Sequence, residues 1–297
     1  MPARSSLDWD REGAGWPNRA QSSFVAAAGL EWHLQRLGQG PTLLLIHGTA
    51  ASTHSWRDLL PRLAARFTVV APDLPGHGFT GRPATYRLSL DGMAESLASL
   101  LGTLALEPAV MVGHSAGAPI AARMCLNGRI APALLVSLNG AWLPFRGSAG
   151  LLFPLMARAL FLNPFSPHLF AGLADKGRVA RLIRQTGSDL DESGIALYHR
   201  LLRHPAHVAG ALGMMANWDL EPLNRDLGRL APKLLLIVGE SDRAVPPSTA
   251  DRVRRLVSGA EVQRLPGLGH LAHEEDPELV AGRILAAAEA LDIPPRD

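Results

Sequence analysis

The chain is poor in cysteine, which limits the class of protein it can be. Its 297 residues include one cysteine, Cys125, so no disulfide can form within the chain. Small secreted domains that depend on disulfides are therefore excluded, and the composition fits a reducing compartment such as the cytoplasm. Because Cys125 lies in an apolar, helix-like stretch, we expect its side chain to be buried and inert.

Long apolar runs are also lacking. The longest, residues 150–165, is too short to span a bilayer and is interrupted by Pro154 and Arg158. The first residues, MPARSSLDWDREGAGWP, carry acidic side chains and no apolar core of the secretory type. The sequence thus predicts neither a transmembrane segment nor a targeting segment, and leaves peripheral contact with a membrane open.

An excess of charge of either sign is missing as well. The formal net charge is +2, charged residues make up 19% of the chain, and clusters of Lys and Arg interleaved with aromatic residues do not occur. A nucleic-acid partner is therefore not expected. Hydrophobic residues reach 47%, which suits a globular protein with either one large α/β domain or a core domain that carries an insertion.

Short apolar runs that end in turn residues recur along the chain, as is typical of strands buried on both faces of a parallel sheet. They are PTLLLIHG, RFTVVAPD, PAVMVGHS, ALLVSLNG and KLLLIVGE. A strand pair that turns at Ala28 and Gly29 precedes them. Helical patterns alternate with the runs, and Ser89 is placed to cap the clearest one. The alternation predicts a mostly parallel, doubly wound α/β sheet, with functional groups just past the C-terminal ends of its strands.

The alternation stops at residues 141–217, where Leu, Phe, Met and Pro are frequent and the patterns are helical. A helical insertion between two core strands suggests a lid. We therefore expect an exposed N-terminal tail at residues 1–20, a core at residues 21–140 and 218–297, and a helical lid at residues 141–217.

The stretch GHSAG, residues 113–117, places a serine between two glycines, after an apolar strand and before a helix. This pattern and context are typical of a nucleophile elbow, in which a tight turn exposes the serine hydroxyl. Gly113 and Gly117 lack the side chains that would crowd such a turn. A small-residue turn with a capping serine would also match the five residues alone, so partners for Ser115 decide between the two interpretations.

Partners for the serine follow in the order that this type of site requires, which is serine, acid, histidine. Asp242 comes directly after the apolar run KLLLIVGE, with Glu240 as the alternative acid. His270 lies in the glycine-flanked loop PGLGHLAHEE, with His273 as its competitor. We favour Asp242 and His270, because the glycine before His270 lets the loop present its ring to Ser115. A serine hydroxyl needs such a base to attack at neutral pH.

Attack on a carbonyl builds negative charge on oxygen, and backbone N–H groups stabilise that charge. We expect the donors of this oxyanion hole to be the amides of Ala116, directly after the serine, and Thr49, in the loop after the first core run. The segment APDLPGHGFTGRP, residues 71–83, also follows a strand. Its His77 and Asp73 fit loop architecture better than catalysis.

Together, HGTAAS, DLPGHG, GHSAG, GESDRAVP and GLGHLAHE resemble the α/β-hydrolase family over residues 22–292. The phrases STHSWRDL, VAPDLPGHGFT, SLNGAWLPFRG, LNPFSPHLFAG, MMANWDLEPL and GLGHLAHEE are similar to those of the magnesium-chelatase accessory α/β-hydrolases of bacteriochlorophyll biosynthesis. This resemblance implies a role near magnesium insertion into protoporphyrin, with magnesium chelatase subunits as partners. It does not define a reaction.

Several functions remain open. The first is a serine hydrolase that acts on an ester or related acyl group of an apolar small molecule, with a tetrapyrrole as one candidate. The others are a non-hydrolytic tetrapyrrole-binding accessory protein, a general carboxylesterase, a carbon–carbon bond hydrolase, and cofactor-free oxygen chemistry. Serine at position 115 argues against the dehalogenase and epoxide-hydrolase branches of the fold, which use aspartate there.

The sequence indicates no cofactor. There is no G-x-x-x-x-G-K-[ST] motif of an ATPase, and His270 and His273 lack a third metal ligand in view. Bulky lid residues are expected to contact an apolar ligand, and Arg146 and Arg158 could meet its carboxylates. The predicted ligand contacts are Trp142, Phe145, Phe153 and Phe161, with Met156 and Phe165 adding apolar lid surface.

Overall fold

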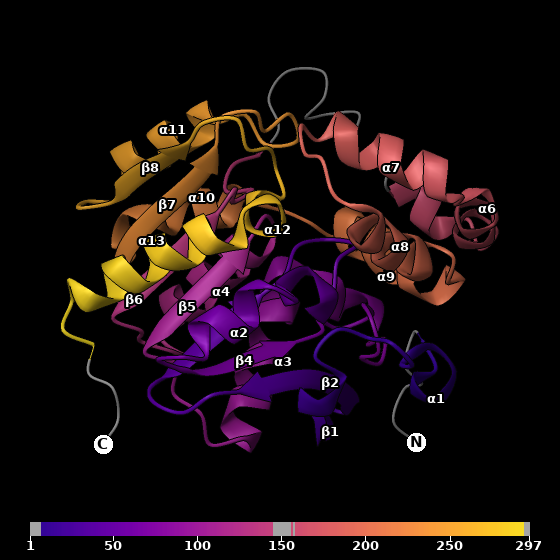
Figure 1. Ribbon diagram of the computed structural model, residues 1–297, viewed down its shortest axis with the longest axis horizontal. Coiled ribbons are helices and arrows are strands. Elements are labelled where there is room, and N and C mark those ends of the chain that lie inside the picture. Colours follow the sequence, from indigo (N-terminus) through magenta and orange to yellow (C-terminus); the bar gives the residue numbers. More distant parts are fainter. Residues whose placement is uncertain (1–6, 145–155, 157, 294–297) are drawn as a thin grey trace.

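The computed structural model describes residues 7–144, residue 156 and residues 158–293. Its centre is one eight-stranded sheet with the strand order β1-β2-β4-β3-β5-β6-β7-β8 (Figure 1). The strands are β1 (Ser22–Ala27), β2 (Leu30–Leu37), β3 (Thr42–Ile46), β4 (Thr68–Pro72), β5 (Val110–His114), β6 (Leu134–Leu138), β7 (Lys233–Gly239) and β8 (Glu261–Leu265). All the core runs and the N-terminal strand pair predicted from the sequence are present.

The sheet is mostly parallel, as predicted. β1 and β2 pair in antiparallel fashion at one edge, β2 is antiparallel to β4, and every other neighbouring pair is parallel. The central strands are apolar on both faces because helices cover both faces, and residues 43–46 of β3 are fully buried. The parallel strands all end at the same edge of the sheet, and the loops that follow them carry the site described below.

Two layers of helices enclose the sheet. The helices of the two layers are α2 (Leu59–Leu63), α3 (Leu90–Thr103), α4 (Gly117–Leu126), α10 (Glu221–Asp226), α11 (Ser248–Leu256), α12 (Ala272–Glu275) and α13 (Pro277–Glu289). Residues of α3, α4, α10 and α11 form one hydrophobic cluster with one face of the strands, and residues of α2, α12 and α13 form a second cluster with the other. Short 3-10 turns η2 (Thr53–Trp56), η3 (Thr85–Leu88) and η4 (Leu227–Arg229) link some of these elements.

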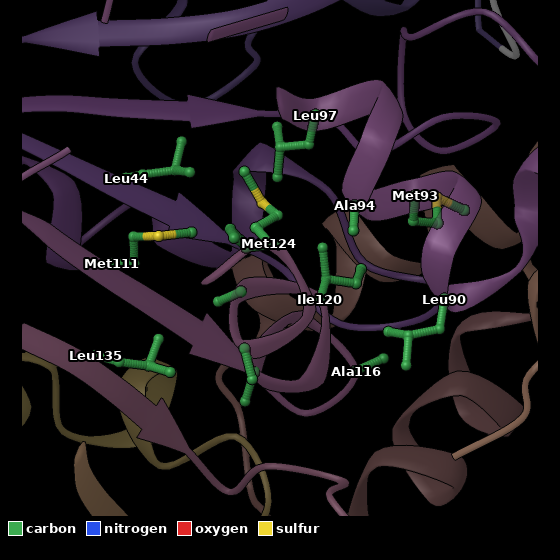
Figure 2. Close-up of a cluster of buried hydrophobic side chains, with 14 of the residues drawn as sticks. Leu44, Leu90, Met93, Ala94, Leu97, Met111, Ala116, Ile120, Met124 and Leu135 are labelled. Carbon is green, nitrogen blue, oxygen red and sulfur yellow. The ribbon is translucent and has the colours of Figure 1, made fainter. Parts of the chain in front are cut away.

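Helix α3 shows how the sequence pattern produces this packing. Its Ser89 cap accepts a hydrogen bond from the amide of Gly92 at 3.2 Å, which satisfies one of the free N–H groups of the first turn. The predicted apolar face of the helix is buried, and Figure 2 shows Leu90, Met93, Ala94 and Leu97 directed into the same cluster as side chains of α4 and the sheet.

A helical insertion separates β6 from β7. It contains α6 (Ser166–Leu173), α7 (Lys176–Gln185), α8 (Glu192–Leu202) and α9 (Pro205–Ala216). α6 packs on α9, and α7 packs on α8, so the insertion has a small core of its own. Figure 1 shows α6 and α7 at the outer edge of the molecule. None of the helices in the part of the chain that the structure describes is long and apolar enough to cross a membrane.

The expectation of an exposed N-terminal tail is wrong for residues 7–20. α1 (Trp9–Glu12) and the turn η1 (Arg19–Gln21) belong to this part of the chain. Leu7 and Trp16 are each only 2% exposed and pack with Phe79 and α8. The Trp16 indole N–H donates to the hydroxyl of Thr53 at 3.1 Å. The Gly, Pro and charged residues suggested a tail, but the sparse apolar side chains between them anchor the segment against the insertion.

Candidate active site

Ser115 lies on the sharp turn between β5 and α4, and its backbone adopts a left-handed conformation with φ of 50°. Such a conformation costs a non-glycine residue about 1–3 kcal/mol and persists only where its surroundings enforce it. Here the Ser115 amide donates to the carbonyl of Leu138 at 3.0 Å, and the Ser115 carbonyl accepts from the amide of Ala141 at 3.0 Å. Both ends of the strained residue are thus held, one by the last residue of β6 and the other by the loop that follows it.

The flanking glycines allow this turn to form. A Cβ atom at Gly113 would lie 2.4 Å from the backbone nitrogen of Ala118, and one at Gly117 would lie 2.0 Å from the carbonyl oxygen of Ile46. Both distances are far shorter than a van der Waals contact, so only glycine fits where α4 crosses β5 and β3. The crowding that the sequence pattern predicts is therefore present in the structure, and it leaves the Ser115 side chain partly exposed.

His270 and Asp242 lie side by side although 28 positions separate them. The Nδ1 atom of His270 is 2.8 Å from Oδ2 of Asp242, in a pair that is almost fully buried. Asp242 follows β7, and His270 lies in the loop after β8; the amide of Ser241 ties the two loops together by donating to the Leu268 carbonyl at 2.9 Å. When Nδ1 donates to the carboxylate, the lone pair of the neutral ring is left on Nε2, the nitrogen that a general base uses.

The carboxylate of Asp242 is fixed by three further donors. Its Oδ1 accepts from the amides of Ala244 and Val245, each at 2.8 Å, and its Oδ2 also accepts from the side-chain amide of Asn139 at 2.8 Å. These bonds fix the orientation of the carboxylate relative to the ring of His270.

Asn139 is a site residue that sequence reasoning missed. It follows β6, has φ of 48°, and is 2% exposed. Its side-chain amide bridges Asp242 to the carbonyl of Gly269, the latter at 3.3 Å. The signal was available: a polar residue directly after a buried strand, in the run ALLVSLNG, lies at the same sheet edge as the other loops.

The two alternatives considered from the sequence lie elsewhere. Glu240 is exposed to solvent. His273 is buried; its Nε2 lies 2.8 Å from the hydroxyl of Ser55, and burial lowers its pKa to about 3. The ring of His273 packs on the ring of His114, which in turn contacts His270 at a centroid distance of 4.8 Å. His273 therefore supports the loop of His270 from behind.

The loop after β3 lies against Ser115. A Cβ atom at Gly48 would come within 2.9 Å of Cβ of Ser115, so a side chain here would displace the serine. Within the described parts of the chain, the amides of Thr49 and Ala116 have no hydrogen-bond acceptor. Unused N–H groups on the two loops beside the serine are the feature that an oxyanion hole needs.

Between described residues, Ser115 and His270 make no hydrogen bond to each other. In enzymes without substrate this contact is commonly long and shortens when substrate binds. The two residues are nevertheless held on adjoining loops, because Nε2 of His114, the neighbour of Ser115, donates to the carbonyl of His270 at 2.9 Å.

Buried neutral histidines hold the loop of Thr49 in place. Nδ1 of His47 donates to the Gly48 carbonyl at 2.8 Å, while its Nε2 accepts from the amide of Leu74 at 2.8 Å. His207 of α9 accepts from the amide of Gly78 at Nδ1, 3.1 Å away, and its Nε2 donates to the carbonyl of Ala50 at 3.2 Å. The insertion is thus bonded to the loop of Thr49 through His207, and burial lowers the pKa of His207 to about 4.

This pKa shift predicts a pH-dependent loss of stability. In the unfolded chain His207 titrates near pH 6.5, whereas in the folded protein it takes up a proton only near pH 4. Its contribution is therefore fully present above pH 6.5 and is lost as the pH falls from 6.5 to 4. We expect the free energy of unfolding of a His207→Gln variant to fall by about 3 kcal/mol less than that of the parent over this range.

The measurement is urea unfolding at pH 7.5 and pH 4.5 for both proteins. His204→Gln is the matched control, because His204 is on the same part of the insertion but only half-buried. Equal losses in the parent and the His207→Gln variant would show that His207 does not titrate in this way.

A segment of the insertion, Thr186–Asp189, runs directly against the acid and histidine loops. A Cβ at Gly187 would lie 1.8 Å from the carbonyl oxygen of Ser241, and one at Gly269 would lie 2.3 Å from Gly187. Ser188 is 2% exposed, and its hydroxyl accepts from the amide of Leu271 at 2.7 Å. This close backbone contact couples the insertion to the loop that carries His270.

Glu275 completes this contact. One carboxylate oxygen accepts from the amide of Asp189 at 3.1 Å, and the other accepts from the amide of Gly269 at 2.9 Å. The residue before His270 is thus tied to the insertion by a carboxylate. Sequence reasoning missed Glu275 and Ser188, because nothing in the local pattern shows that an insertion loop returns to this edge of the sheet.

The loop at residues 71–83 has the structural role expected from the sequence. Asp73 is fully buried and accepts from the amides of Thr53 at 2.7 Å and Phe79 at 2.9 Å, and it pairs with His33 at 2.8 Å. Burial alone would raise the pKa of Asp73, but the interaction with His33 and the backbone donors lower it to about 2. His77 is also fully buried.

The predicted ligand contacts in the insertion are only partly described. Phe145, Phe153 and Arg146 lie outside the described residues. Phe161 is half-buried, packs with α9, and lies under the guanidinium of Arg82 at 5.6 Å. Met156, Phe165 and Arg158 are exposed.

Trp142 does not have the position expected of a lid residue. It is 1% exposed, belongs to the hydrophobic cluster on one face of the sheet, and donates its indole N–H to the hydroxyl of Ser137 at 2.8 Å. The prediction of a ligand contact for Trp142 is therefore corrected: its ring packs in the core, because the chain continues along the sheet beyond β6 before it enters the insertion.

The described residues contain no group of three or more His, Cys, Asp and Glu side chains arranged to hold a metal ion. Cys125 is partly buried in α4, and desolvation raises the pKa of its thiol to about 12. A thiol with so high a pKa is a poor nucleophile, which agrees with the inert role expected for it.

Comparison with known proteins shows the family of the chain, which is the one that the sequence motifs resemble. A family model described as alpha/beta hydrolase fold matches residues 41–277. The chain is 40% identical to the magnesium-chelatase 30 kDa subunit of Rhodobacter capsulatus over 275 residues, which cover 92% of this chain and 96% of the relative. It is 28% identical to the 2-(acetamidomethylene)succinate hydrolase of Mesorhizobium japonicum, over 83% of this chain and 87% of that enzyme.

A solved structure of the epoxide hydrolase CorEH superimposes with a TM-score of 0.79 at 22% identity, covering 91% of this chain and 99% of that one. At this level of identity the likeness concerns the fold alone.

Proposed function

The chain belongs to the alpha/beta hydrolase fold family, and on that premise we propose that it is a serine hydrolase with Ser115 as its nucleophile. The observation that carries this proposal is the combination of a strained, partly exposed Ser115 with the buried His270–Asp242 pair on the neighbouring loops. Each part has ordinary structural explanations alone. Their convergence at one edge of the sheet is what a hydrolytic site requires.

In the proposed reaction, Nε2 of His270 removes the proton of the Ser115 hydroxyl as Oγ attacks the carbonyl carbon of an ester or related acyl group. Asp242 keeps the ring in the required tautomer and stabilises the imidazolium that forms. The imidazolium then gives its proton to the leaving alcohol, and an acyl-enzyme remains. Water, activated by His270 in the same way, releases the acid and regenerates Ser115.

The negative charge that develops on the carbonyl oxygen is stabilised by the backbone amides of Thr49 and Ala116. Each such donor contributes about 3 kcal/mol of transition-state stabilisation. His47 and His207 support this role by fixing the loop of Thr49 through its backbone carbonyls on either side.

The substrate class that we propose is apolar. The insertion is rich in Leu, Phe and Met, and we propose that it acts as a lid that excludes water and selects bulky acyl or alcohol groups. The relative from Rhodobacter capsulatus is named a magnesium-chelatase subunit. This name supports a tetrapyrrole ester as the substrate and magnesium chelatase subunits as partners, in bacteriochlorophyll biosynthesis.

That name also supports a second candidate function, in which the protein binds a tetrapyrrole and assists magnesium chelatase without hydrolysis. The two functions make different demands on Ser115. Hydrolysis requires its hydroxyl, whereas binding requires only the apolar surface around it.

The test uses a fluorophosphonate probe, followed by a panel of acyl esters of increasing size and porphyrin methyl esters. We expect covalent labelling by the probe. We also expect ester turnover that rises with the apolar size of the ester, and chromatography measures the release of acid and alcohol. Labelling without turnover of any ester, together with porphyrin binding detected by its absorption spectrum, would favour the second function. Absence of labelling would reject the hydrolase.

A further inference from the structure

Exposed apolar side chains are concentrated in one short part of the chain. Of the eleven large hydrophobic residues that are exposed in the described part of the chain, seven belong to the stretch that runs from Met156 to α7. These are Met156, Leu162, Phe165, Leu169, Phe170, Leu173 and Leu182. Scattered exposed apolar residues are ordinary, but a contiguous group of this kind marks an interaction surface.

The group forms an ordered surface. Phe165, the N-cap residue of α6, is followed at intervals of four residues by Leu169 and Leu173, so the three lie along one stripe of the helix; they are 77%, 61% and 45% exposed. α6 keeps other residues, such as Ala171, for packing on α9. The stripe is therefore separate from the face that holds the helix in place.

A groove begins beside this stripe. It has a volume of about 590 Å³ and is lined mostly by apolar side chains of α6, α7, α8 and α9, with Arg178, Arg181 and Gln185 of α7 as its polar lining. Phe170 and Leu173 of α6 and Leu182 of α7 line it, and so does Ala50, next to Thr49 in the loop after β3. The groove thus extends from the exposed apolar surface toward the loop next to Ser115.

The same part of the chain is basic. Met156 and residues 158–185 include five basic residues, Arg158, Lys176, Arg178, Arg181 and Arg184, against one acidic residue, Asp175. The stretch therefore carries a charge of +4, whereas the whole chain carries +2. In α7 the residues Val179 and Ile183 are buried, while Arg181, at the groove, and Arg184 are exposed. Figure 1 places α6 and α7 at the outer edge of the molecule, where a flat surface could reach both.

From these observations we infer that α6 and α7 dock on an anionic membrane surface. Apolar side chains beside a basic helix face are the features that bind the interface of such a bilayer: the stripe of α6 enters the headgroup region, and Arg181 and Arg184 meet lipid phosphates. The mouth of the groove then opens at the membrane, where an apolar substrate or ligand would be dissolved. Docking does not require the chemistry at Ser115, so it stands or falls independently of the hydrolase proposal.

The experiment is flotation of the full chain with vesicles of phosphatidylcholine alone and of phosphatidylcholine with 30% phosphatidylglycerol. We expect flotation with the anionic vesicles, weakened by 0.5 M NaCl because salt screens the attraction. An Arg181→Glu/Arg184→Glu variant should bind more than about 30-fold more weakly, since the loss of each basic residue near the surface weakens binding about fivefold and each new glutamate is also repelled by the anionic lipid. A Leu169→Ser/Leu173→Ser variant should also bind more weakly, at unchanged charge.

The matched controls are Arg254→Glu/Arg255→Glu and Leu256→Ser, which alter exposed residues of the same types on α11. They should float like the parent. Circular dichroism verifies the fold of every variant, and size-exclusion chromatography gives the oligomeric state. The inference is overturned by flotation with neither vesicle, by equal effects of the α11 variants, or by a dimer that the Leu169→Ser/Leu173→Ser variant dissociates, because the surface would then belong to a second copy of the chain.

Discussion

Replacement of Ser115 by alanine is expected to abolish hydrolysis and covalent labelling while the fold persists. Alanine keeps the Cβ atom, which already fits at φ of 50°, and removes only the hydroxyl that attacks the substrate. In serine hydrolases with a triad, loss of the nucleophile lowers kcat by about 10⁶, because the remaining residues act only as a unit with it. We expect a loss of this size for the best ester found for the parent protein.

The control for this variant is Ser99→Ala, which removes an exposed hydroxyl from α3. It should be labelled and should turn over ester like the parent, and thermal unfolding should be nearly the same for all three proteins. Labelling that persists in the Ser115→Ala protein, mapped by mass spectrometry to another serine, would overturn the assignment of the nucleophile.

The fold could be predicted well because its signals are local. Each core strand is a short apolar run between turn residues, and the period of α3 places its apolar residues on one face. Gly113 and Gly117 similarly predict a crowded turn, and in the structure backbone atoms lie where their side chains would be. A strand that is buried on both faces requires several consecutive apolar residues. A helix that crosses a strand too closely for a side chain requires glycine at the point of contact.

The parts that sequence reasoning missed depend on contacts between distant segments. Asn139 reaches Asp242 across 103 positions, and Glu275 joins the insertion to the loop of His270 across 86. Trp16 finds its place through the distant Thr53, and Trp142 through the core face of the sheet. No local periodicity encodes such pairs, because a polar or aromatic residue in a loop has the same pattern whether it is anchored or exposed.

Asp242→Asn is expected to lower turnover by about 10⁴, with a smaller loss of stability. Oδ1 of Asp242 accepts from the amides of Ala244 and Val245, and Oδ2 accepts from Asn139 and His270. The NH₂ group of an asparagine must therefore face donors whichever way it is turned. Directed at His270, it accepts nothing from Nδ1 and forces the proton onto Nε2, which then cannot act as a base; other triads lose about 10⁴ in kcat by this change.

Glu240→Gln provides the contrast that decides which acid acts. Glu240 is exposed and lies on the same loop as Asp242, so its replacement changes charge by the same amount near the site. We expect that variant to keep most of the parent's turnover. Labelling by the fluorophosphonate should slow in the Asp242→Asn protein and not in the Glu240→Gln protein, because the probe also requires a base. A damaging Glu240→Gln change with a mild Asp242→Asn change would mean that the pair of His270 with Asp242 is structural, and that another acid orients the base.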